Sequence, residues 1–398
     1  MLLMARMVLL PVMMLAAVST RADDIVAEVE EVIAEVDSTA TVVVNEVVEA
    51  PIEATESVVA RRSSTRWIKQ LIDNGFHINE PGVDYPAFPR FALKVYNWGN
   101  RVFNTYDTTY VQATGKNWKL FFKNVNWANN YEMIFNDRTR VALMSDPNAD
   151  IGGYLCFMAV SVGYMFDAKQ LAGRHVNPRT GFNFNFTCAR FSGDIMLSNV
   201  KGDAKILRFG DYRNGALLNM PFDDISNKTL SAKVFYFFNH NRYSHAAAYC
   251  FSKYQLKSAG TWIAGLNFAN QEISINFENL PEDMLHRMPE LLPNYYFHYR
   301  DYYLLGGYAH NWVLKPRRWL INLTAMPALG YKHTYEDSTD NRHDIFGANF
   351  SGLASVVYNN RQMFVSIQGR FDLYMYTTPS FTFFNTYEQL LATVGVRF

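Results

Sequence analysis

The sequence predicts an all-β fold: a transmembrane antiparallel β-barrel of roughly 12 strands, preceded by a short, partly helical periplasmic segment. Hydrophobic residues make up 49% and aromatic residues 15% of the chain, yet the mean hydropathy is slightly negative. Outside the N-terminus there is no run of about 20 apolar residues, the length that a membrane-spanning helix needs. Strands that face lipid on one side and an enclosed lumen on the other give many aromatic residues without high hydropathy.

The N-terminal residues are typical of an exported protein. Arg6 supplies a positive charge, residues 7–18 form an apolar stretch, and Thr20 and Ala22 place small residues where cleavage is determined. This order of basic, apolar and small-residue regions is that of a secretory signal peptide. We therefore expect residues 1–22 to be removed during export to the outer membrane of a Gram-negative bacterium.

Two segments separate the predicted signal peptide from the predicted barrel. Residues 23–60 contain eleven acidic residues and no Lys or Arg, whereas residues 61–398 contain 35 basic and 26 acidic residues. High charge and low complexity predict that 23–60 is a flexible acidic leader. Residues 61–105 carry apolar residues at helical spacing around a proline-containing loop. We expect this segment to be periplasmic and to pack at the barrel mouth.

Residues 106–398 form the predicted barrel, and residues 363–376 show its pattern most clearly. One face of this stretch is apolar, while the other contains Arg370 and Asp372. The alternation runs over fourteen residues, whereas a typical strand of a soluble protein has about 5–6. Charged side chains in the middle of a strand need water, which the lumen of a barrel provides.

The same alternation recurs along the predicted barrel in thirteen stretches bounded by turn residues. Because single-chain bacterial barrels have even numbers of strands, we predict roughly 12. The stretches are residues 107–115, 117–127, 131–145, 151–166, 181–198, 231–239, 259–268, 271–277, 295–313, 317–332, 345–358, 363–376 and 387–398.

The last predicted strand resembles the C-terminal sorting signal of outer-membrane barrels. Its apolar residues occupy every second position and include a terminal Phe. We expect the barrel-assembly machinery to recognise this strand. The apolar residues are Leu390, Ala392, Val394, Val396 and Phe398.

Four short strings in the predicted barrel resemble a known family. They are residues 107–111 (DTTYV), 115–118 (GKNW), 238–244 (FNHNRYS) and 257–260 (KSAG). Their order and spacing are similar to those of exported Gram-negative proteins catalogued as domain of unknown function 4421, over about residues 100–398. The resemblance implies an outer-membrane barrel. It brings no established activity and no catalytic residue.

Four residues are predicted to line the lumen, because they lie on the polar faces of predicted strands. They are His298, Arg300, Arg370 and Asp372. Salt-bridged residues in a lumen either lock a narrow barrel shut or tune what passes through it. Envelope structure and solute passage are therefore the two roles that the sequence favours for the barrel.

Two other classes of protein remain open. His240 and Ser244 lie four residues apart, and outer-membrane lipid hydrolases pair a serine with a histidine base. Neighbouring strand residues point to opposite faces, so a regular strand could not direct Ser244 and His245 to one site. A polar turn is the alternative account, and we assign no catalytic residue. The third class is a soluble exported β-sandwich that binds a ligand.

The sequence indicates no cofactor and no metal. We find no phosphate-binding glycine loop, zinc-ligand spacing or acidic calcium loop. Cys156, Cys188 and Cys250 form neither a metal pattern nor an obvious disulfide framework. Basic residues are dispersed among aromatic residues, which argues against nucleic acid as a partner. We expect the partners to be outer-membrane lipid and lipopolysaccharide, whose anionic groups suit a basic barrel.

Overall fold

The computed structural model describes most of the predicted barrel and little of what precedes it. The predicted signal peptide and acidic leader lie outside the described residues, as does most of the predicted periplasmic segment. The described residues are 69, 85, 90, 94, 97–99, 105–116, 118–157, 160–171, 180–288, 292–335, 343–378 and 380–398.

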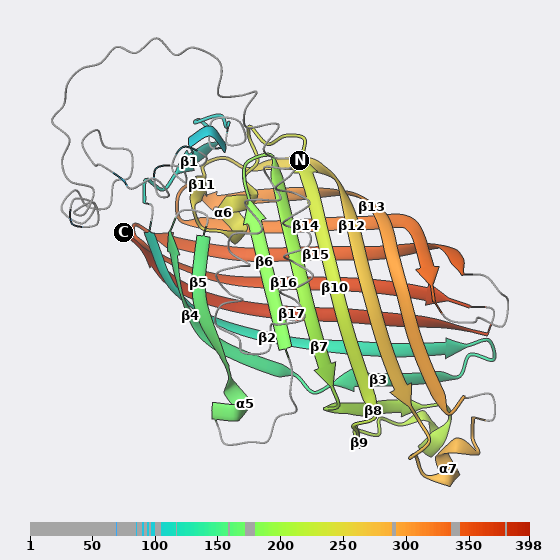
Figure 1. Cartoon of the computed structure of the whole chain (residues 1–398). Coiled ribbons are helices and arrows are strands. Elements are labelled where there is room, and N and C mark those ends of the chain that lie inside the picture. Colours follow the sequence, from blue (N-terminus) through green and yellow to red (C-terminus); the bar gives the residue numbers. More distant parts are fainter. Residues whose placement is uncertain are drawn as a thin grey trace, which may run out of the picture. The chain divides into compact units, whose positions relative to one another are not determined.

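Twelve long strands of the described residues form one antiparallel sheet that curls around an interior (Figure 1). The last strand, β17, pairs with the first long strand, β2, as closure of a barrel requires. The wall begins at β6 and runs to β2, which pairs both with β3 and with β4, and β4 pairs in turn with β5. Strands β5 and β6 follow each other in the chain. Hydrogen bonds between β5 and β6 are not among those of the described residues. The twelve strands are β2 (Trp118–Phe135), β4 (Asn148–Phe157), β5 (Val160–Asp167), β6 (Thr180–Thr187), β7 (Phe191–Lys201), β10 (Ile225–Phe237), β12 (Ala259–Asn276), β13 (Asn294–Lys315), β14 (Trp319–Thr334), β15 (Asp344–Asn360), β16 (Met363–Thr377) and β17 (Phe381–Arg397).

Shorter elements lie at the two ends of the barrel. We call the end that holds Trp118 and Phe398 the terminal end, and the opposite end the far end. At the far end, β3, β8 and β9 extend the sheet, and α7 lies between β12 and β13. At the terminal end, α6 and β11 lie between β10 and β12, and β11 pairs with β1. No helix of the described residues is long and apolar enough to cross a membrane. The short elements are β1 (Val111–Ala113), β3 (Arg140–Ser145), α5 (Ala168–Leu171), β8 (Ala204–Phe209), η2 (Tyr212–Gly215), β9 (Met220–Phe222), α6 (His245–Tyr249), β11 (Lys253–Gln255) and α7 (Glu282–Leu285).

The residues that face outward are largely apolar, and many of those that face inward are polar. On β16, Met363, Val365 and Ile367 are exposed, whereas Ser366 and Gln368, which alternate with the last two, are buried. A soluble protein has the reverse preference, because its charged residues stay in water. The distribution therefore fits a sheet whose outer face contacts lipid. Buried polar or charged residues of the inner face include Lys119, Lys233, Asp301, Lys332, Asp372 and Arg397.

Aromatic side chains mark two levels on the outer face. Nearer the far end, Phe268, Tyr302 and Tyr331 lie next to one another on β12, β13 and β14. Nearer the terminal end, Trp312 and Trp319 are exposed on β13 and β14. From Tyr302 to Trp312 is about 34 Å along the strand, or about 26 Å of membrane thickness at a tilt of about 40°. This agrees with the apolar band, about 25 Å tall, between the aromatic girdles of a membrane barrel.

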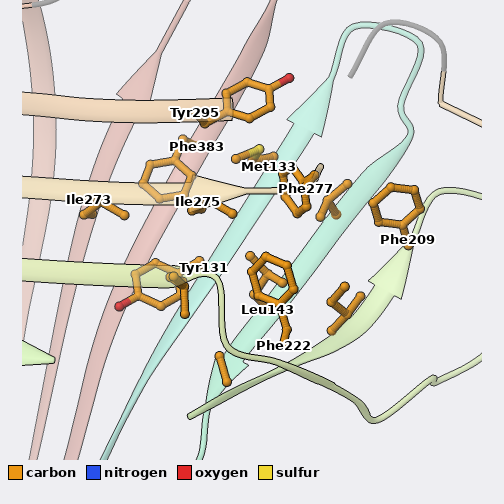
Figure 2. Close-up of a cluster of buried hydrophobic side chains, with 14 of the residues drawn as sticks. Tyr131, Met133, Leu143, Phe209, Phe222, Ile273, Ile275, Phe277, Tyr295 and Phe383 are labelled. Carbon is orange, nitrogen blue, oxygen red and sulfur yellow. The ribbon is translucent and has the colours of Figure 1, made fainter. Parts of the chain in front are cut away.

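An apolar cluster fills the far end of the interior (Figure 2). Phe297 of β13 stacks on Phe383 of β17 with ring centroids 4.3 Å apart, although three strands separate β13 from β17 in the sheet. Leu143, Phe209 and Phe222 join the same cluster from β3, β8 and β9. Parts of the wall that are not neighbours in the sheet therefore touch at this end.

The predicted barrel fold and strand number are confirmed, but several strand boundaries differ. The predicted stretch 131–145 contains a turn at 136–139, and the predicted stretch 151–166 is two strands. The predicted stretches 259–268 and 271–277 instead form the single strand β12. The sequence predicted two strands here because polar residues occupy outward positions near the far end of β12. At that end the strand continues beyond the apolar band.

Candidate functional site

The middle of the barrel interior contains a network of buried charges. The Nζ of Lys233 on β10 lies 2.5 Å from Oδ1 of Asp372 on β16, and Ser351 Oγ donates to the same oxygen over 2.6 Å. The second carboxylate oxygen of Asp372 accepts from Nε of Arg370 over 2.7 Å. Nη1 of Arg370 lies 2.5 Å from Oδ2 of Asp194 on β7. We call these five residues the lumen network. It ties β7 and β10 to β15 and β16 across the interior.

The register of the strands explains why these charges meet. Arg370 and Asp372 are two residues apart on β16, so both point inward. Asp194 and Lys233 are directly opposite each other in the pairing of β7 with β10, and both also point inward. Each charge therefore has an opposite charge at the same level of the barrel. Because a buried charge that loses its partner is costly, these residues stabilise the closed wall only as a set.

A second buried ion pair lies on neighbouring strands. The Nζ of Lys332 on β14 is 2.5 Å from Oδ1 of Asp301 on β13, and Asn349 Nδ2 donates to Oδ2 of Asp301 over 3.0 Å. The ammonium group of Lys332 also lies 3.5 Å from the ring centroid of Tyr299. The pair fills the space between the lumen network and the far-end cluster with polar and aromatic side chains.

Residues 239–258 occupy the terminal end of the interior, and we call them the plug segment. This segment joins β10 to β12 and contains α6 and β11 (Figure 1). Tyr249 Oη donates to Oδ1 of Asn322 over 2.7 Å, and Asn311 Nδ2 donates to the carbonyl oxygen of Ser244 over 3.0 Å. Three further side chains of the wall donate to carbonyl oxygens of the plug segment, namely Lys119 to Cys250, Gln368 to Ala248 and Arg397 to Phe251.

The local sequence of the plug segment favours a short helix with an apolar surface. Ser244 has an extended backbone, and its Oγ accepts from the backbone N of Ala247 over 3.2 Å, so Ser244 is the N-cap of α6. His245 is buried, with its ring centroid 4.9 Å from that of Phe237. Burial lowers the pKa of His245 to about 3. The imidazole is therefore neutral at pH 7, as an apolar environment requires.

Two small cavities lie among the described residues, one beside the plug segment and one near the far end. One is lined by residues that include Lys253, Gln255 and Asn359, and the other by residues that include Tyr131 and Asn227. Each has a volume of about 10 Å³. A cavity needs about 10–15 Å³ to hold one water molecule. Each is therefore too small for a solute larger than water.

The structure does not bring His240 and Ser244 into contact among the described interactions. Nδ1 of His240 faces the carbonyl oxygen of Phe237 at 3.3 Å. Ser244 is 5% exposed, and its Oγ serves as the cap of α6. A serine nucleophile needs a base within hydrogen-bond reach. The described geometry gives Ser244 a structural position and no such partner.

The four predicted lumen residues lie on two different faces. Arg370 and Asp372 point inward as described, whereas Arg300 is exposed and His298 half-buried on the outer face of β13. The inward positions of β13 are the odd-numbered ones, such as Tyr299. Aromatic residues occupy both faces of this strand, so polarity alone indicates the wrong face. The sequence-based placement of His298 and Arg300 in the lumen is therefore corrected.

The apolar residues of the predicted sorting strand all lie on the outer face of β17. Leu390, Ala392, Val394, Val396 and Phe398 are exposed, while Thr393 and Arg397 between them are buried. The ring of Phe398 also stacks on that of Trp118, with centroids 6.5 Å apart, and the backbone N of Phe398 donates to the carbonyl oxygen of Trp118 over 3.0 Å.

Sequence reasoning missed Lys233, Asp194 and Asn322, which hold the interior together. Lys233 lies within a predicted strand, and a lone charge at an alternating position is the signal that could have identified it. Its partner Asp372 is 139 residues away, and nothing in the sequence relates the two. Asn322 contacts the plug segment, whose position inside the barrel has no local sequence signal.

Comparison with solved structures gives matches of low similarity to bacterial outer-membrane proteins. The outer membrane protease OmpT from Escherichia coli is 8% identical, with 72% of this chain and 98% of that chain covered and a TM-score of 0.29. The toluene transporter TodX of P. putida is 7% identical, with 75% and 97% covered and a TM-score of 0.24. Neisserial surface protein A is 8% identical, with 70% and 97% covered and a TM-score of 0.21. Since every TM-score is below 0.5, no activity is carried over from these proteins.

Sequence comparison identifies a family for the barrel. No curated protein matches the chain. The model of one family matches residues 105–398, which include every long strand, the lumen network and the plug segment. The chain therefore belongs to the family described as Domain of unknown function (DUF4421).

Proposed function

We propose that this chain is an integral outer-membrane β-barrel, closed at rest, that contributes to the structure of the envelope. The apolar outer face and the polar inner face support a membrane position. Most turns at the terminal end are short, such as 316–318 and 361–362. Because bacterial barrels have short turns on the periplasmic side, we place the terminal end in the periplasm and the far end outside the cell.

The observation that carries the closed state is the contact between parts of the wall that are not neighbours. Phe297 stacks on Phe383 at the far end, Lys233 pairs with Asp372 in the middle, and the plug segment fills the terminal end. An open diffusion pore keeps its walls apart around water. In this barrel, contacts cross the interior at the far end and in the middle, and the plug segment fills the terminal end. A structural role therefore fits better than open diffusion.

Recording in planar bilayers tests the closed state. The full chain, refolded and inserted, is expected to give no steady conductance. Insertion is checked first by resistance of the folded protein to SDS without heating. A stable conductance from protein that passes this check would contradict the closed barrel. Failure of the check itself would contradict the membrane position.

Gated passage of a solute is a second candidate, and the polar contacts of the plug segment favour it. Asn311 and Asn322 hold the segment by hydrogen bonds, which can exchange for water if the segment moves. A variant in which a short glycine-serine turn replaces residues 240–256 separates the two functions. If the role is structural, this variant should also give no conductance, because the apolar cluster at the far end still closes the barrel. Discrete current steps from the folded variant would instead support gating.

Export and assembly follow the same proposal. We infer that residues 1–22 are a signal peptide, so protein isolated from membranes should begin near residue 23. We also infer that the barrel-assembly machinery binds the outer face of β17. Phe398→Ser should lower the amount of folded protein in the outer membrane severalfold, whereas Phe238→Ser, also at an exposed aromatic residue, should not. Equal amounts of the two variants would contradict the role of β17.

A further inference from the structure

Beyond the far-end aromatic level, charged and titratable side chains lie on the outer face of five neighbouring strands. In the register, Glu272 is opposite both Lys228 and His298. His333 is likewise opposite both Arg300 and Asp344. The strands that carry the two rows, from β10 to β15, are neighbours in the sheet (Figure 1). We call it the rim cluster, and it consists of Lys228, Glu272, His298, Arg300, His333 and Asp344.

The two carboxylates of the rim cluster already have basic partners. Lys228 Nζ lies 3.1 Å from Oε2 of Glu272, and His333 Nδ1 lies 2.7 Å from Oδ1 of Asp344. Both acids are therefore engaged within the cluster. Among the described interactions, the guanidinium of Arg300 has a ring contact and no carboxylate partner.

Arg300 is held by an aromatic side chain. Its guanidinium carbon lies 5.0 Å from the ring centroid of Tyr335, and the ring of His298 stacks on the same tyrosine with centroids 4.4 Å apart. Among the described interactions, the guanidinium of Arg300 thus faces a ring and not a carboxylate. A ring contact orients a guanidinium plane but satisfies none of its N–H donors.

The rim cluster lies at the level of lipid headgroups if the barrel spans the membrane as proposed. Arg300 is two residues beyond Tyr302, and His333 is two residues beyond Tyr331. Two residues advance a strand by about 7 Å, so both side chains lie just outside the aromatic girdle. Girdle residues sit at the boundary between acyl chains and headgroups.

We propose that the rim cluster binds a phosphate group of an anionic lipid in the outer leaflet, with Arg300 as the main contact. The inference rests on the proposed membrane position. A guanidinium presents a planar fork of donors that matches two phosphate oxygens. His333 lies directly opposite Arg300 in the register, and His298 stacks on the same tyrosine, so both rings flank this fork. The lipid-facing band directly below holds the acyl chains, so a lipid is favoured over a soluble anion.

Lipid binding to the inserted full chain tests this proposal. The probe is a diphosphorylated lipid A in micelles of a neutral detergent, compared with the same lipid after enzymatic removal of its phosphates. The wild type should bind the phosphorylated form about tenfold or more tightly, the factor expected for a charge-assisted contact. Arg300→Gln should lose most of this preference, and Arg300→Lys should keep part of it because the charge remains without the fork.

Arg140→Gln is the matched control, because Arg140 is an exposed arginine at the same end on β3. It should bind like the wild type. Equal binding of the two lipid forms, or an Arg300→Gln variant that binds like the wild type, would overturn the site. Displacement of the lipid by millimolar inorganic phosphate would assign the surface to a soluble anion and overturn the lipid assignment. Only protein that resists SDS without heating is used, so failure of the membrane position is detected separately.

Discussion

The Nζ of Lys233 lies 2.5 Å from Oδ1 of Asp372, although four strands separate β10 from β16 in the sheet. Both side chains are almost fully buried, so the pair crosses the interior of the barrel. Arg370 and Ser351 complete the shell of donors around the carboxylate. This ion pair joins parts of the wall that are not neighbours in the sheet, and it lies beside an apolar cluster that includes Leu305 and Met326.

Removal of one member of the lumen network should destabilise the barrel strongly. Lys233→Met leaves the buried carboxylate of Asp372 without its ammonium partner and should lower the free energy of unfolding by roughly 3–5 kcal/mol. Urea unfolding in lipid vesicles measures this change. Lys228→Met, on the same strand, breaks the more exposed pair with Glu272 and should cost less than about 1 kcal/mol. A smaller effect at Lys233 than at Lys228 would show that the network does not hold the wall.

Acidification should loosen the plug segment through His245. Burial lowers the pKa of His245 to about 3, whereas a histidine of the unfolded chain has a pKa of about 6.5. Between these values the unfolded chain binds a proton that the folded chain excludes. The stability that neutral His245 contributes is therefore present above about pH 6.5 and is lost as the pH falls toward about 3.

Thermal unfolding between pH 7.5 and pH 4.5 measures this effect. His245→Gln should flatten the decline in stability by roughly 1 kcal/mol per pH unit. His286→Gln changes an exposed histidine that follows α7. Its stability should change with pH as steeply as that of the wild type. An unchanged slope in His245→Gln would contradict a neutral histidine in the plug segment.

The hydrogen bonds of Asn322 should stabilise the plug segment in its position inside the barrel. Asn322 accepts from Tyr249 and donates to Tyr243 and Asn311. Asn322→Leu leaves these groups without that partner, so the segment should detach more often. Cys156, which is buried against the plug segment, reports the detachment when Cys188 and Cys250 are replaced by serine.

A membrane-impermeant maleimide should label Cys156 at least severalfold faster in Asn322→Leu than in the parent. Asn294→Leu, at an exposed asparagine of the far end, provides the comparison and should label at the parental rate. Rates that do not differ between the two variants would mean that Asn322 does not hold the segment.

The barrel could be predicted from the sequence because its outer face has one simple requirement. Met363, Val365 and Ile367 must be apolar to contact lipid, and they recur at every second position. Apolar residues at every second position also identified the outer face of β17. This pattern fails on β13, where Tyr295 and Tyr299 point inward and Tyr302 points outward. Tyrosine suits both environments, so the pattern does not distinguish the faces.

The interior could not be predicted, because its contacts depend on the curl of the whole sheet. Arg370 and Asp372 were identified as inward-facing, but Lys233 and Asp194 approach them from the other side of the barrel. A polar turn was the alternative interpretation of the stretch around His240 and Ser244, and nothing in the sequence indicates that residues 239–258 turn inward. Only the closed sheet shows that this segment turns inward and packs among inner-face side chains.

The most direct test of the account is the environment of successive residues along β16. Spin labels are placed singly at residues 364–374 in a cysteine-free background, and the barrel is inserted into lipid vesicles. Accessibility to oxygen, which concentrates in lipid, should peak at the odd-numbered positions such as 365, 367 and 373 and fall at 366, 368 and 372 between them. Higher accessibility of the odd positions to a water-soluble nickel reagent, or no alternation at all, would contradict an outer face that contacts lipid.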